Sequence, residues 1–176
     1  MHLDVNLDAR IFVAHRDGVA WLRVEGKGTF QNSSPVRDYA VSRLDAGDAS
    51  LVIDLEACDY MDSTFMGTLT AIGCRMLGRS RQALEVVNAA ERAYALLENL
   101  GLNEILSVRR DVGQWAAFKK SIARKLVCVE DTSGRQDKAE LMLDAHQTLA
   151  DTSRENAARF GGVVDLLKQE LQEARP

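Results

Sequence analysis

The feature that most constrains the fold of this chain is a regular alternation of short apolar runs with helix-like segments. Residues 51–55 form a compact apolar run, which is typical of a strand buried on both faces of a sheet. Residues 63–77 follow with apolar side chains at spacings of three and four, which predicts an amphipathic helix. Strands and helices that alternate in this way predict an α/β fold with a mixed or largely parallel sheet.

The same alternation continues on both sides of this strand and helix. Asp17-Gly18 lies between two apolar runs and predicts a hairpin turn. Gly101 follows a helical pattern and predicts the end of that helix. The further predicted strands are residues 11–13, 19–24, 84–87 and 105–108, and the further predicted helices are residues 35–44 and 91–100.

The pattern changes in the last third of the chain. Residues 114–126 predict a helix, residues 126–129 are a weak strand candidate, and residues 130–134 form a polar break. Residues 136–174 then form a long helical stretch, punctuated by Gly161-Gly162, with apolar or small side chains at spacings of three and four. This stripe predicts a helical extension that either folds back onto its own domain or contacts another chain, for example as a homodimer through the C-terminal helix.

Composition limits the class of protein. The 176 residues carry 26 acidic and 22 basic side chains, a net charge of −4, and this mild acidity argues against a nucleic-acid-binding surface. Three cysteines without a C-x-x-C pair argue against a disulfide framework and favour a reducing cytosol. The N-terminus lacks the apolar core of a signal peptide, and no stretch reaches the roughly 20 apolar residues that a membrane span needs. We therefore expect a cytoplasmic protein without a membrane span.

The most informative segment is LVIDLEACDYMDSTFMGTL, residues 51–69, which combines a buried strand, an acidic loop and the start of a helix. In the simplest interpretation, Asp62 or Ser63 caps that helix. In the functional interpretation, the hydroxyl at the helix N-terminus carries a phosphate, whose charge the helix dipole stabilises. The acidic residues before Ser63 predict an acidic rim beside it: Asp54, Glu56, Asp59 and Asp62.

This segment resembles the STAS domain of anti-sigma factor antagonists. The matching positions are Asp54-Leu55, Tyr60, Met61, Asp62, Ser63, Thr64 and Gly67. The resemblance covers residues 8–112 and leaves residues 113–176 as a helical C-terminal extension. It implies a STAS-like mixed β-sheet flanked by helices.

The resemblance also implies a function, with Ser63 as the phosphoacceptor of a partner-switching regulator of transcription. In such a pathway, an anti-sigma factor that is also a serine kinase phosphorylates the serine and a phosphatase restores it, and the dephosphorylated form binds the partner. The implied partner-binding residues are Asp62, Ser63, Thr64, Phe65, Met66 and Gly67. Two departures stand out. Phe65 replaces a glycine, so its ring either adds an apolar anchor or packs inward, and residues 28–32 lack the acidic side chain that the family commonly places near the acceptor.

No set of catalytic or metal-ligating residues stands out. His2, His15 and His146 have no cysteine or carboxylate at ligand spacing, and no Ser-His-Asp set is indicated. We therefore expect no enzyme activity, no metal and no cofactor. Two alternatives stay open: a constitutive STAS adaptor subunit of a transporter or signalling complex, and a small-molecule or nucleotide-binding protein that uses a crevice at the strand ends.

Overall fold

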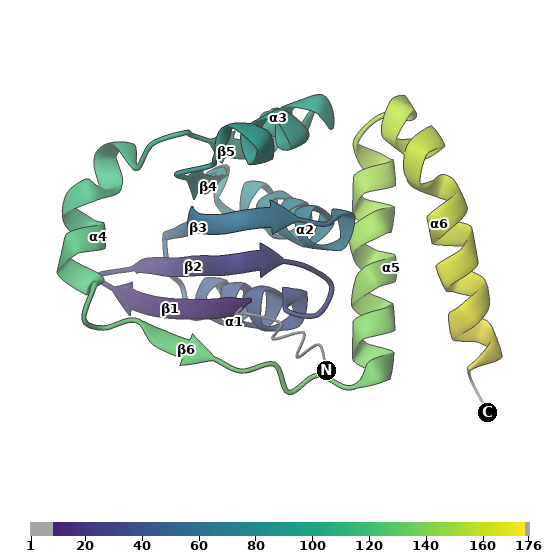
Figure 1. The fold of residues 1–176 in the computed structure, drawn as a ribbon, viewed down its shortest axis with the longest axis horizontal. Coiled ribbons are helices and arrows are strands. Elements are labelled where there is room, and N and C mark those ends of the chain that lie inside the picture. The colour runs from purple at the N-terminus through teal and green to yellow at the C-terminus, as the bar shows by residue number, and fades with distance from the viewer. Residues whose placement is uncertain (1–8, 175–176) are drawn as a thin grey trace, which may run out of the picture.

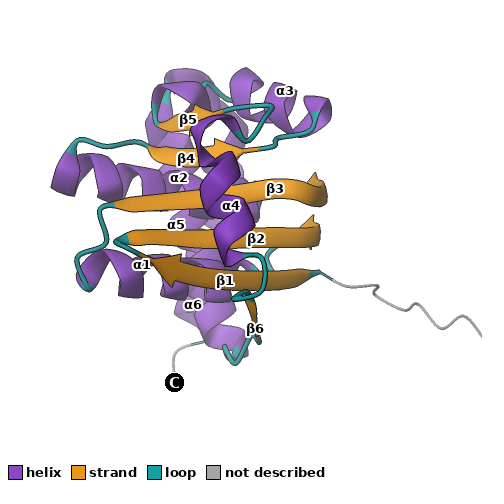
Figure 2. Ribbon diagram, turned by 90° about the vertical axis from the view of Figure 1, so that its left-hand side faces the viewer, coloured by secondary structure: helices purple, strands orange, loops and turns teal. Residues whose placement is uncertain are grey.

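The computed structural model describes residues 9–174, so His2 and the predicted domain start at residue 8 lie outside the described residues. A six-stranded sheet forms the centre of the molecule, in the order β5-β4-β3-β2-β1-β6 (Figures 1 and 2). The strands are β1 (Arg10–Arg16), β2 (Val19–Gly28), β3 (Ser50–Met61), β4 (Leu84–Val87), β5 (Leu106–Val108) and β6 (Val127–Val129). From β2 to β5 neighbouring strands are parallel, whereas β1 is antiparallel to both β2 and β6. The predicted mixed α/β sheet is confirmed.

Helices surround this sheet on several sides. Figure 1 shows α1 and α2 behind the sheet, α4 at one end and the pair α5–α6 at the other. The helices are α1 (Ser33–Asp45), α2 (Ser63–Ser80), α3 (Glu91–Asn99), α4 (Ala116–Ile122), α5 (Arg135–Thr152) and α6 (Arg154–Glu173), with short 3-10 turns η1 (Leu102–Glu104) and η2 (Gly113–Trp115). Within the described part of the chain, none of these helices has the length and apolar character needed to cross a membrane.

The hydrophobic core has two parts because successive side chains of a strand point to opposite faces of the sheet. Leu22 and Ile53 belong to the larger cluster, which α2 and α6 complete. Their neighbours Trp21 and Val52 belong to a smaller cluster on the other face. Helix α4 covers this smaller cluster: the centroid of its Phe118 ring lies 5.9 Å from the centroid of the Trp21 ring. The two faces of the sheet therefore have different coverings.

The prediction of an acidic loop after residue 55 is wrong, because strand β3 continues through these residues to Met61. The neighbouring strand β2 is also long, and it pairs Lys27 with Tyr60 and Gly28 with Met61 after two shifts of register. Backbone pairing with β2 thus extends the strand past its apolar run. The strand predicted at residues 126–129 exists as β6. Gly101, with a φ of +69°, follows the end of α3 as predicted.

The predicted long C-terminal helix is two helices. The chain turns at Ser153, whose backbone is extended (φ −160°, ψ 164°) and whose Oγ accepts a hydrogen bond of 3.0 Å from the Asn156 N–H. A serine in this position caps the start of α6, so the break falls there. Gly161 and Gly162 lie inside α6 with open space around them and do not interrupt it. The resulting C-terminal hairpin, α5 with α6, packs on its own domain, and a homodimer through it stays a prediction.

Candidate functional site

Asp62 connects the start of α2 to the loop after β2. Its backbone is extended, and its Oδ1 accepts a hydrogen bond of 2.8 Å from the Phe65 N–H, which makes it the N-cap of α2. Its Oδ2 accepts a second hydrogen bond of 2.9 Å from the Phe30 N–H. The Asp62 N–H in turn donates to the Gly28 carbonyl at 2.9 Å. One carboxylate therefore sets where Ser63, the next residue, begins the helix.

The Asp62→Ala variant is expected to lose about 1–2 kcal/mol of unfolding free energy, because both amide donors lose their acceptor. Asp62→Asn is the matched control, since its side-chain oxygen can still cap α2, and it should lose less than half as much. Urea unfolding of the three proteins measures both values. An alanine variant as stable as the wild type would show that the capping contacts contribute nothing.

Ser63 contacts His146 of α5, a residue 83 positions away in the chain. The Ser63 Oγ lies 2.9 Å from the His146 Nε2, and the His146 Nδ1 lies 2.7 Å from the Met142 carbonyl oxygen. A carbonyl oxygen only accepts, so these bonds assign the proton of a neutral imidazole to Nδ1. Nε2 is then the acceptor, and the Ser63 hydroxyl donates to it. His146 is 4 % exposed, whereas Ser63 is half-buried.

The other residues predicted to bind a partner are buried. Thr64, Phe65, Met66 and Gly67 all lie beneath the surface, and Asp62 is half-buried like Ser63. Phe65 is fully buried, and a Cβ added at Gly28 would come within 2.6 Å of its ring. The ring therefore packs inward against the backbone of β2, which is one of the two outcomes that the sequence left open. Binding of a partner by these residues stays a prediction.

Gly67 marks the place where α5 crosses α2. A Cβ added there would come within 2.7 Å of the Ala145 carbonyl carbon and 2.9 Å of the Ala145 Cβ. Such distances leave room only for glycine, so the two helix backbones are in direct contact. At the start of α5, the Lys138 Nζ donates to the Gln31 carbonyl at 3.3 Å. The C-terminal extension therefore covers the candidate site, a contact that the sequence analysis missed. The one sequence signal for it is His146, which lies at helical spacing within the stripe of residues 136–174.

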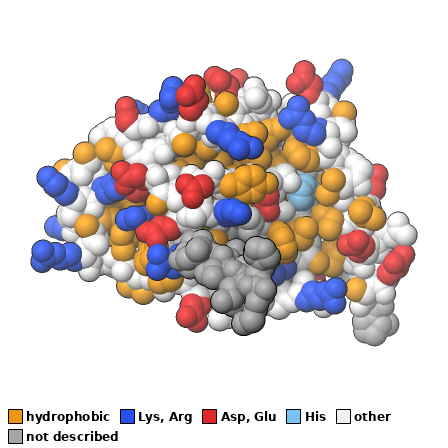
Figure 3. Space-filling model, in the orientation of Figure 1, with side chains coloured by type: hydrophobic (Ala, Val, Ile, Leu, Met, Phe, Trp, Pro, Cys, Tyr) orange, Lys and Arg blue, Asp and Glu red, His pale blue; other side chains and the backbone are white. Residues whose placement is uncertain are grey.

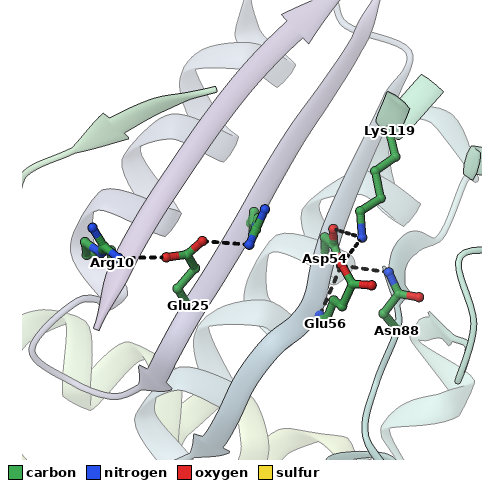
Figure 4. Close-up of polar contacts among 7 residues, drawn as sticks. Arg10, Glu25, Asp54, Glu56, Asn88 and Lys119 are labelled. Atoms are coloured by element: carbon green, nitrogen blue, oxygen red, sulfur yellow. Dashed lines mark hydrogen bonds and ion pairs between the residues drawn. The ribbon is translucent and has the colours of Figure 1, made fainter. Parts of the chain in front are cut away.

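Asp54, part of the matched segment, lies on the opposite face of the sheet from Ser63. Its neighbours Ile53 and Leu55 point into the core on the α2 side, so Asp54 points to the α4 side. It is fully buried, and its Oδ1 accepts hydrogen bonds from the Asn88 Nδ2 at 2.8 Å and the Glu56 N–H at 3.1 Å (Figure 4). The predicted acidic rim beside Ser63 is therefore wrong for Asp54, because strand alternation places it on the other face.

Lys119 of α4 neutralises this buried carboxylate. Its Nζ lies 3.0 Å from the Asp54 Oδ2 and also pairs with Glu56 (Figure 4). Burial alone would lower the pKa of the Lys119 ammonium, but the hydrogen bonds to Glu56 and Asp54 outweigh it and the pKa is raised. Glu25 on the same face pairs with Arg10 at 3.2 Å and with Arg23 at 2.8 Å. In the space-filling view of Figure 3, acidic and basic side chains are accordingly interspersed over this face.

These polar groups form ion pairs with one another and do not assemble a metal centre. Among residues 9–174, no three His, Cys, Asp or Glu side chains are arranged to hold a metal ion. His146, which contacts the candidate residue Ser63, has one ring nitrogen hydrogen-bonded to the Met142 carbonyl and the other to the Ser63 hydroxyl. The site is thus a helix start with one hydroxyl, one capping carboxylate and one imidazole.

Comparison with known proteins identifies the fold family. The STAS domain family matches residues 10–115, which is more than half of the 176 residues. The chain belongs to the STAS domain family. The match begins with β1 and ends with η2, so the C-terminal hairpin lies outside it.

Two solved structures show the same fold. A candidate anti-sigma factor antagonist from Thermotoga maritima aligns with a TM-score of 0.52 at 16% identity, over 61% of this chain and 91% of that chain. An anti-sigma factor antagonist from Mycobacterium paratuberculosis aligns with a TM-score of 0.51 at 19% identity, over 65% of this chain and 92% of that chain. At these identities the likeness is one of fold. The comparison with curated proteins finds no match.

Proposed function

We propose that this STAS protein is a regulatory protein-binding switch of the anti-sigma factor antagonist type, with Ser63 as its phosphoacceptor. Its partners are an anti-sigma factor that is also a serine kinase and a phosphatase that reverses the modification. The protein acts as substrate and ligand in the cytoplasm, not as an enzyme. The observation that carries the proposal is the position of Ser63, which is the first residue of α2 and lies directly after the capping Asp62.

The chemistry of a helix start supports reversible phosphorylation at this hydroxyl. The N-terminal end of an 18-residue helix carries a partial positive charge that stabilises a phosphate there. Phosphoserine adds about −1.5 to −2 charges at neutral pH, next to the carboxylate of Asp62. A partner surface that is acidic or apolar then meets a concentrated negative charge, and its affinity falls. The dephosphorylated form is therefore the binding form.

The Ser63→Asp variant is expected to bind the partner kinase at least tenfold more weakly than the wild type or Ser63→Ala, because it places a permanent charge at the start of α2. The three proteins serve as baits for an ATP-binding serine kinase from a lysate of the source cells, and titration with the purified kinase gives the affinities. Incubation with that kinase and ATP should then add one phosphate to Ser63, detected by mass spectrometry.

Ser121→Ala is the matched control, because Ser121 is exposed and lies in α4, away from the candidate site. This variant should bind and be phosphorylated like the wild type. Phosphate on another residue, together with equal affinity of the three Ser63 proteins, would contradict the switch. It would instead favour a constitutive STAS adaptor. This second candidate is supported by the hydrogen bond between the Ser63 hydroxyl and His146, because that bond already engages the hydroxyl within the protein.

A further inference from the structure

We propose that the C-terminal hairpin is an autoinhibitory lid, which covers the start of α2 and must move away before a partner docks there or Ser63 is phosphorylated. The regulatory meaning of the lid rests on the proposed function. Its closure is a property of this chain alone, because both the lid and the surface beneath it belong to one polypeptide. It can therefore be measured without any partner.

The steric evidence is the contact between the backbones of α2 and α5. At Gly67 an added Cβ would lie 2.7 Å from the carbonyl carbon of Ala145, so nothing fits between the helices. Thr64 and Met66, on the same stretch of α2, are 3 % and 6 % exposed. A partner that docks on α2 at Gly67 therefore needs the position that α5 now occupies.

The hairpin is attached to the domain both by hydrogen bonds and through the hydrophobic core. Lys138 donates to the Gln31 carbonyl at 3.3 Å, and the Asn156 Nδ2 donates to the buried Leu100 carbonyl at 2.8 Å. Both helices also contribute to the larger core cluster, through Leu149, Ala150, Phe160 and Val164. In contrast, Leu141 and Leu167 are buried but belong to neither core cluster of the domain. Because α5 and α6 also pack on each other, we expect them to stay paired when the hairpin moves.

The chemistry at Ser63 couples lid position to phosphorylation. In the transfer from ATP, the bond from Oγ to the γ-phosphorus forms as the bond to ADP breaks, ADP leaves, and the hydroxyl proton passes to a base of the kinase. In the closed form the Ser63 Oγ lies 2.9 Å from the His146 Nε2, so α5 stands beside the hydroxyl and obstructs the approach of a kinase with its bound ATP. Only the open form is therefore a substrate, and the phosphorylated form cannot close. A change that opens the lid should therefore increase the rate of phosphorylation of Ser63.

Two glycines of α2 provide a matched pair of variants for the test. The methyl group of Gly67→Ala overlaps the backbone of α5, while that of Gly78→Ala enters open space. Both substitutions favour the helical state of α2 itself, because alanine is a better helix former than glycine. The first variant should therefore expel the lid, and the second should leave it closed.

The probe is a cysteine at Ser63, labelled with N-ethylmaleimide and followed by mass spectrometry. The background carries Cys74→Ser and Cys128→Ser, because both thiols are exposed, and keeps Cys58, whose burial in the core makes it a reporter of global unfolding. We expect the Ser63→Cys thiol to react at least tenfold faster with Gly67→Ala than with Gly78→Ala, while Cys58 stays unlabelled. Equal rates for the two glycine variants, or Cys58 reacting together with the probe, would overturn the lid.

A second measurement separates the lid from the proposed function. In proteins that retain Ser63, the partner kinase should phosphorylate Gly67→Ala at least tenfold faster than Gly78→Ala. Equal phosphorylation rates would overturn the lid while leaving the switch intact. Faster labelling of the cysteine probe without any phosphorylation of Ser63 would support the lid and contradict the phosphoacceptor role.

Discussion

The Phe65→Ala variant is expected to lose about 3–5 kcal/mol of unfolding free energy, the usual cost of removing a buried aromatic side chain. Phe65 is fully buried in the larger core cluster, and its ring lies against the backbone at Gly28. Alanine would leave a cavity between α2 and β2, two elements that cannot collapse onto each other without breaking the bonds of Asp62. Urea unfolding monitored by circular dichroism measures the loss.

Phe65→Leu is the matched control for this prediction. Leucine has a different shape from the phenyl ring but fills most of its volume. This variant should therefore lose less than half as much unfolding free energy as the alanine variant. A loss below about 1 kcal/mol for the alanine variant would be typical of an exposed side chain. It would contradict the inward packing of Phe65 and favour its other interpretation, an apolar anchor for a partner.

The Lys119→Met variant is expected to lose about 2–3 kcal/mol of unfolding free energy, because it leaves the buried Asp54 carboxylate without its counter-charge. Asp54 is 0 % exposed, and Lys119 is the cation that the structure places within 3.0 Å of its Oδ2. The remaining hydrogen bonds from Asn88 and the Glu56 N–H offset part of the cost. Methionine keeps the apolar stem of lysine, so the loss reports the charge.

Two further variants check this interpretation by urea unfolding. Lys120→Met changes the neighbouring exposed lysine and should alter stability by no more than about 0.5 kcal/mol. Asp54→Asn combined with Lys119→Met removes both charges and should recover much of the lost stability. A double variant that is less stable than Lys119→Met alone would contradict the charge argument.

The pKa of Lys119 sets the pH range of this effect. Its pKa is raised in the folded protein, so its stabilising contribution is fully present below the ordinary lysine pKa of about 10.4 and is lost as the pH rises through the raised value. The stability difference between wild type and Lys119→Met should therefore stay constant from pH 7 to pH 9 and shrink only in stronger alkali. A difference that already shrinks between pH 7 and pH 9 would exclude Lys119 as its source.

Much of the fold follows from local patterns that the sequence displays. Each of the predicted strands exists, and so do the helix that begins at Ser63 and the turn at Gly101. The two errors have different causes. β3 continues beyond its apolar run because β2 offers it backbone partners as far as Gly28, and those partners lie more than 30 residues away. The C-terminal stretch breaks at Ser153, where a single cap outweighs a continuous periodic pattern.

Some features of the candidate site also follow from the local sequence, and others depend on the tertiary structure. The order Asp62, Ser63, Thr64 after a buried strand was sufficient to place a capped helix start with a hydroxyl in its first turn, because capping involves residues within one turn of each other. The inward position of Phe65 and the opposite orientation of Asp54 depend on which face of the sheet each element covers. Strand alternation separates Asp54 from Ile53 and Leu55, but only the tertiary structure shows which face of the sheet α2 covers.

The sequence by itself thus determined the alternation of strands and helices, the STAS-type helix start and the presence of a helical extension, because periods of two and of three to four residues report local backbone geometry directly. Only the tertiary structure decided that the extension folds back as a hairpin, that Ser63 and His146 are hydrogen-bonded and that Gly67 lies against Ala145. These contacts join residues about 80 positions apart. They arise from the close packing of whole helices, which requires glycine at one position and places histidine at another. No periodic pattern in the neighbouring sequence predicts these two residues.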